Sequence, residues 1–141
     1  MKHIVLVIAF LMLTQLSSMA QSLHKPFQGI FKNNEIGVTL QLDLYEARLE
    51  APGMGFLGKL HGYMNGRIYG MWLLTSHTIE GNAATLRFSN DQGADAQTIR
   101  ITHINDSIYQ YEAVGGNEVK RVQGRKLVKI PGTMQLIRTD F

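Results

Sequence analysis

The side chains that most often carry out chemistry are present in this sequence, but they do not stand in a catalytic or metal-binding spacing. Ser76, Ser89 and Ser107 all lack the Gly-x-Ser-x-Gly setting of a nucleophile elbow. The chain has no cysteine, so no thiolate can act as a nucleophile or a metal ligand. Histidines that follow residue 20 are never two or four positions apart, as paired ligands on one strand or helix would be. They are His24, His61, His77 and His103. We therefore expect no metal and no cofactor.

Carboxylates are scattered along the chain rather than paired. Glycoside hydrolysis would need two of them to converge on one bond, and the acidic residues available for this are Asp43, Glu46, Glu50 and Glu80. Nothing in their spacing brings them together, and a surface role explains each of them. We therefore expect that the protein is not an enzyme.

Aromatic side chains are the residues best suited to bind a small molecule. An aromatic body with a polar tip suits a pocket that holds an apolar ligand and anchors one polar group, and Arg67 is a candidate anchor for a carboxylate. The alternative is that these aromatic residues are ordinary core residues, which strands favour in any case. The candidate ligand-binding residues are Arg67, Tyr69, Met71, Trp72, Tyr109 and Tyr111.

The N-terminus has the pattern of a secretory signal peptide. Lys2 and His3 precede ten apolar residues, 4–13, and Ser18-Met19-Ala20 is a small-x-small cleavage site. Ten apolar residues are too few to span a bilayer, which takes about 20. We expect residues 1–20 to be removed and residues 21–141 to form one domain with no transmembrane segment. An exported chain without cysteine is more typical of a bacterial periplasmic or secreted protein than of an animal one.

The net charge of the chain is small, but positive charge is concentrated near the C-terminus. The net charge of +3 is too small to indicate a nucleic-acid partner. Five cations nevertheless lie within ten residues near the C-terminus, with only Glu118 close by. One interpretation is a solvated strand pair in which lysine protects an edge, and the other is a patch for an anionic partner. The five cations are Lys120, Arg121, Arg125, Lys126 and Lys129.

Short alternating segments separated by turn residues predict an all-β fold. Alternation of apolar and polar residues runs through 36–44 and continues over Ala47, Leu49 and Ala51 until Pro52-Gly53. Asn65-Gly66 favours a two-residue type I′ turn, which predicts a hairpin over 58–74 with Met64 opposite Arg67. In that register Tyr69 and Trp72 lie on opposite faces of one strand. Further strands are expected within 84–88, 97–104, 107–114, 118–122, 125–130 and 133–138.

Eight to ten strands joined mostly by short turns predict an antiparallel meander that closes into a small β-barrel, because closure removes the exposed edges. A β-sandwich is the alternative. Gly70-Met71-Trp72 fits the Gly-x-Trp pattern of lipocalins, although in that family the motif lies on the first strand. The chain resembles the calycin group, which includes lipocalins and avidins, in architecture only. That resemblance implies a ligand-binding barrel and carries over no binding residue.

These observations predict a non-enzymatic, exported β-barrel that binds a small, largely apolar ligand. The alternative is a protein-interaction or inhibitor module of the cell envelope, acting as a homodimer or with an envelope partner, because both predicted faces of the 58–74 hairpin carry apolar side chains.

Overall fold

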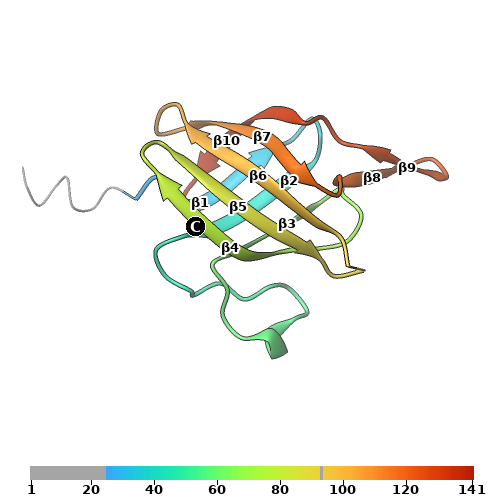
Figure 1. Ribbon diagram of the computed structural model, residues 1–141, viewed down its shortest axis with the longest axis horizontal. Helices are drawn as coiled ribbons and strands as arrows, with labels where there is room; N and C mark the ends of the chain where they lie inside the picture. Colours follow the sequence, from blue (N-terminus) through green and yellow to red (C-terminus); the bar gives the residue numbers. More distant parts are fainter. Residues whose placement is uncertain (1–24, 93) are drawn as a thin grey trace, which may run out of the picture.

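Ten strands make up almost all of the regular structure (Figure 1). The computed structural model describes residues 25–92 and 94–141, so the predicted signal peptide, residues 1–20, lies outside the described residues. One short 3-10 helix, η1, covers Gly55–Leu57. The strands are β1 Gln28–Asn33, β2 Val38–Asp43, β3 Gly62–Gly66, β4 Trp72–Glu80, β5 Ala83–Asn90, β6 Ala96–His103, β7 Ile108–Gly116, β8 Lys120–Gln123, β9 Lys126–Lys129 and β10 Thr133–Thr139.

Eight of these strands close into an antiparallel barrel. Their order around the barrel is β1-β10-β7-β6-β5-β4-β3-β2, and β2 pairs again with β1. Strands β8 and β9 form a separate two-stranded sheet inserted between β7 and β10. The prediction of an all-β barrel is thus confirmed, and the barrel leaves no free edge except where two strands diverge, as described below.

The barrel interior is filled by side chains. Alternate residues of each strand point inward, so that β2 contributes Val38, Leu40 and Leu42, and β5 contributes Ala84, Leu86 and Phe88. These residues belong to one continuous apolar cluster whose members are at most 9% exposed. An eight-stranded barrel has an interior just wide enough for this kind of packing.

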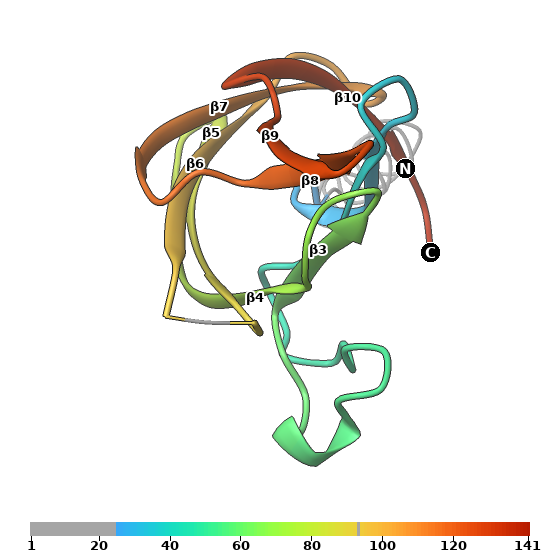
Figure 2. The ribbon, with the colours of Figure 1, turned by 90° about the vertical axis from the view of Figure 1, so that its right-hand side faces the viewer.

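The two ends of the barrel are built differently. One end, which we call the mouth, carries the β1–β2 turn, the β3–β4 loop, the β5–β6 turn and the β8–β9 insertion. Figure 2 shows β8 and β9 crossing this end. The opposite end carries the long connection 44–61, which extends away from the barrel (Figure 1), and the N-terminal segment, where Phe27 is fully buried.

The predicted two-residue turn at Asn65-Gly66 does not form. Instead β3 continues along β2 as far as the pair Val38–Gly66, and the N–H of Arg67 donates to the carbonyl of Gly37 at 2.7 Å. The predicted pairing of Met64 with Arg67 is therefore wrong, and Met64 pairs with Trp72. Pairing with β2 and burial of Ile68 in the core favour this longer loop over the local turn preference.

Two other boundaries differ from the prediction. The alternation over residues 47–51 is not a strand of the barrel, because the chain leaves β2 after Asp43, and Leu49 forms only an isolated bridge with Leu60 inside the same connection. Residues 58–61 likewise precede β3 rather than belonging to it. Strand β1, by contrast, was not predicted, since glycine and polar residues interrupt its alternation. In the described part of the chain, helices long and apolar enough to cross a membrane are absent.

Candidate functional site

The β8–β9 insertion forms an arm whose base is anchored to the mouth. We define the arm as residues 120–129. Val119 and Ile130, which flank it, are buried, and the N–H of Ile130 donates to the carbonyl of Val119 at 3.1 Å. The N–H of Tyr69 also donates to the carbonyl of Lys120 at 2.7 Å. These contacts hold the arm beside the β3–β4 loop.

The β3–β4 loop is fixed in turn by the β5–β6 turn. The N–H of Met71 donates to Oδ1 of Asp91 at 2.7 Å, and Nδ2 of Asn90 donates to the carbonyl of Tyr69 at 3.1 Å. Gly70 has a φ of +78°, and a β-carbon there would lie 2.7 Å from the Asn90 amide. Glycine is thus required between Tyr69 and Met71, because it allows both the positive φ and the close approach.

These contacts create a small cleft at the mouth, which we call the Trp72 cleft. Its volume is about 150 Å³. Trp72 and Tyr69 supply its aromatic surface, and the arm contributes Lys120 and Leu127. The full lining is Tyr69, Trp72, Asn90, Gln92, Asp95, Glu118, Lys120 and Leu127. Tyr69 and Trp72 meet here because Tyr69 lies in a loop, and not on the opposite face of the same strand as predicted.

Trp72, which lines this cleft, has an unsatisfied polar atom. Its side chain is 2% exposed, and its Nε1 has no hydrogen-bond partner among the residues that the structure describes. Buried indole N–H groups normally find an acceptor, because leaving one unpaired costs about 1–3 kcal/mol.

Tyr111 lines a neighbouring hollow on the other side of the arm's base. This hollow has a volume of about 250 Å³ and shares Glu118 with the Trp72 cleft. Gln97 lies beside Tyr111 and is held by hydrogen bonds from its Nε2 to the carbonyls of Thr98 and Gly115. Burial raises the pKa of Tyr111 to about 12, so its hydroxyl is neutral at physiological pH and can donate a hydrogen bond.

The other three predicted site residues lie elsewhere. Arg67 is exposed and lines a third hollow at the mouth together with Arg121. Met71 acts through its backbone, because its N–H donates to Asp91 and so fixes the β3–β4 loop. Tyr109 is at the opposite end of the barrel, where its hydroxyl donates to the carbonyl of Pro26 and its ring packs edge-to-face on Phe31. Tyr109 therefore has a structural environment far from the mouth.

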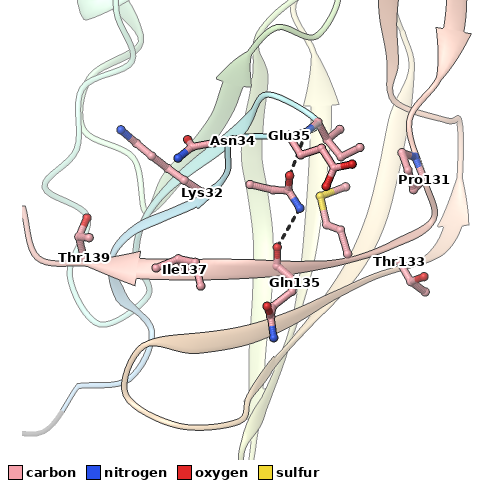
Figure 3. Close-up of a pocket in the computed structure, with 11 residues that line it drawn as sticks. Lys32, Asn34, Glu35, Pro131, Thr133, Gln135, Ile137 and Thr139 are labelled. Atoms are coloured by element: carbon pink, nitrogen blue, oxygen red, sulfur yellow. Dashed lines mark hydrogen bonds between the residues drawn. The ribbon is translucent and has the colours of Figure 1, made fainter.

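An open groove lies beside β10 and has a volume of about 720 Å³. It arises because β10 pairs with β7 from Thr133 to Ile137 but pairs with β1 only from Ile137 to Thr139. Asn33, on the β1 side, donates to the carbonyl of Gln135 at 3.0 Å and accepts from the N–H of Ile36 at 2.9 Å. Figure 3 shows Gln135, Ile137 and Thr139 of β10 among the residues that line the groove. The groove is more open to solvent than the Trp72 cleft and has no aromatic side chain in its lining, so it is the poorer small-molecule site.

Two of the four carboxylates considered in the sequence, Asp43 and Glu50, have structural partners. Asp43 accepts hydrogen bonds from Gln28 and Arg48. Glu50 forms an ion pair with Lys59 at 3.1 Å. Over residues 25–92 and 94–141, groups of three or more metal-ligating side chains do not come together.

Polar residues around the Trp72 cleft were missed by sequence reasoning. Asn90, Gln92 and Asp95 come from the β5–β6 turn, and Glu118 and Lys120 come from the base of the arm, so their proximity to Trp72 depends on strand order alone. No protein-family model, curated protein or solved structure matches this chain.

Proposed function

We propose that this protein is a non-enzymatic, exported β-barrel that binds a small, largely apolar ligand in the Trp72 cleft. The main support is Trp72, which is buried and aromatic, lines a concave site, and has an indole N–H without a partner among the described residues. The eight-stranded antiparallel barrel supports the resemblance to the calycin group, whose members bind ligands in or near the barrel. Since the interior is packed with side chains, the ligand is placed at the mouth.

The size and chemistry of the cleft define the ligand. A volume of about 150 Å³ corresponds to a molecule near the size of benzene. The ring or short acyl chain of such a ligand would lie against Trp72 and Leu127, and one acceptor atom would receive the indole N–H. Asn90, Asp95 and Lys120 surround the cleft and would select for the polar end of the ligand. A larger ligand would extend toward Tyr111.

The first experiment is native mass spectrometry of protein isolated gently from its host, compared with the denatured mass. We expect an added mass that is lost on denaturation. Trp72 is the only tryptophan of the chain, so its fluorescence reports directly on the cleft. We expect a panel of small aromatic and short acyl compounds to shift this fluorescence.

The matched variants are Trp72→Phe and Tyr109→Phe. Trp72→Phe keeps an aromatic ring but removes the N–H, and we expect it to weaken binding about tenfold, as measured by calorimetry. Tyr109→Phe removes a hydroxyl at the opposite end of the barrel and should leave affinity unchanged. A clean monomer mass together with unmoved fluorescence across the panel would contradict the proposal.

A second candidate function, a protein-interaction or inhibitor module, is favoured by the groove beside β10. Residues 133–136 of β10 have no strand partner on the β1 side. An extended segment of another protein can pair with such an edge. A photo-crosslinking side chain at Gln135 should then give one discrete adduct in the native envelope, whereas the same group at Arg87, an exposed position on β5, should give none. Equal labelling at both positions, or none at either, would argue against this candidate.

A further inference from the structure

The excess of positive charge in this protein is concentrated in the arm. Five of the 14 Lys and Arg residues in the chain lie within residues 120–129, and none of the 11 acidic residues does. The rest of the sequence therefore has fewer cations than anions. Lys129 forms an ion pair with Glu118 at the base of the arm, which leaves Lys120, Arg121, Arg125 and Lys126 to set its charge. Such segregation produces a local positive field rather than a general basic character.

Every residue of the arm except the half-buried Arg121 is exposed, and the centre of the arm is apolar. Figure 1 shows it extending beyond the barrel strands. Val122 and Leu127 are paired across β8 and β9, so they share one face of the arm, and they are 62% and 48% exposed. Gly124, with a φ of +66°, forms the two-residue turn at the tip together with Arg125. The result is an apolar pair bordered by cations near the tip and at the base.

Two arginines converge beside this apolar pair. Arg67 from the β3–β4 loop and Arg121 from the arm line one hollow of about 240 Å³ together with Val122. Arg67 Nη2 donates to the carbonyl of Asn34 at 2.6 Å, and Arg121 Nη1 donates to the carbonyl of Ile36 at 3.4 Å. Each guanidinium has five N–H donors, so most of them remain available for a ligand. Planar, permanently charged guanidinium groups are well suited to bind phosphate.

We propose that the arm docks on an anionic lipid bilayer, with a lipid phosphate bound between Arg67 and Arg121 and with Val122 and Leu127 in the interfacial region. Because the arm is positively charged, its partner should be anionic. The exposed Val122–Leu127 pair favours a bilayer over an acidic glycan, because a soluble polyanion has no apolar layer to receive it. This inference shares Leu127 with the Trp72 cleft but does not require that a ligand binds there.

The test is co-sedimentation of the full mature chain with vesicles of phosphatidylcholine alone and of an equimolar mixture with phosphatidylglycerol. We expect binding to the mixed vesicles only, and we expect that binding to weaken as salt is added. A double variant, Arg125→Gln with Lys126→Gln, should lower the partition coefficient about 25-fold, since each basic residue near an anionic surface contributes a factor of about five. Lys32→Gln with Arg87→Gln removes the same charge from the barrel wall and should have little effect.

Two further measurements distinguish a bilayer from other sources of anionic groups. Val122→Ser with Leu127→Ser should weaken vesicle binding but leave any binding to heparin unchanged. Inorganic phosphate at the concentration of the lipid phosphate should not displace the protein from vesicles. Equal binding to heparin and vesicles with no effect of the serine variants would overturn the proposal in favour of an acidic polymer. Full displacement by phosphate would overturn it in favour of a soluble phosphate ligand.

Discussion

Replacing Asp43 with alanine should lower the free energy of unfolding by about 3 kcal/mol. Asp43 is 0% exposed, and its carboxylate organises the point where the chain leaves the barrel. Oδ2 accepts from Gln28 Nε2 at 3.0 Å and from Arg48 Nε. Oδ1 accepts from the N–H groups of Tyr45 and Glu46, both at 3.1 Å. Alanine would leave these donors without their acceptor at a buried position.

The same carboxylate should make stability depend on acidity. Burial alone raises the pKa of Asp43, but hydrogen bonds from Gln28, Arg48 and the two backbone N–H groups outweigh burial and hold the pKa below its usual value of 3.8. The unfolded chain then takes up the proton at a higher pH than the folded chain. The stabilisation is therefore present above about pH 4 and is lost as the pH falls through the lower, folded-state pKa.

Urea denaturation followed by circular dichroism, at neutral pH and through the acid range, measures both effects. Asp43→Asn should flatten the acid dependence as well as reduce stability at neutral pH. Glu46→Ala is the matched control, because Glu46 is exposed and donates to Asp43 only through its backbone. If Asp43→Ala and Glu46→Ala reduced stability equally, the structural role assigned to Asp43 would be wrong.

Replacing Gly66 with valine should cost about 3 kcal/mol or more, or prevent folding. Gly66 has a φ of +118°, and a β-carbon there would lie 2.2 Å from the carbonyl oxygen of Gly37. That oxygen belongs to the backbone and cannot move without breaking the β2–β3 pairing. A β-branched residue is also the one least able to adopt a positive φ.

Thermal unfolding of Gly66→Val beside Gly132→Val measures this effect. Gly132 is the matched control, because its φ lies outside the positive range and a β-carbon there would meet no atom within 4 Å. Gly53→Val separates the two contributions, since Gly53 has a φ of +72° but open space around its α-carbon. A Gly66→Val protein as stable as the Gly132→Val protein would show that the close approach of Gly37 is not required.

Local patterns identified most of the strands. Alternation within 84–88, 97–104 and 107–114 corresponds to β5, β6 and β7, and the two cationic segments near the C-terminus form β8 and β9. Strands β5, β6 and β7 were predictable because period-two alternation reflects the burial of one strand face, and the closed barrel buries one face of each of them. Closure itself was predictable from the number of strands and the need to remove edges.

Only some of the residues of the candidate site could be predicted from the sequence. Trp72 and Tyr111 could be predicted as site residues because this sequence has few large aromatic residues in its short strands. Tyr69 was named but placed on the wrong face, since the Asn65-Gly66 preference suggested a turn that pairing with β2 overrides. Asn90, Asp95 and Glu118 could not have been identified, because their sequence settings are those of ordinary turns.

The sequence by itself determined the class of fold, the alternation that fills the barrel and the concentration of charge in residues 120–129. Only the tertiary structure decided which side chains meet at the mouth. Strand pairing brings the β3–β4 loop, the β5–β6 turn and the arm to one end of the barrel. The physical reason is that alternation records the environment of a residue on its own strand, whereas a binding site depends on contacts between segments far apart in the chain.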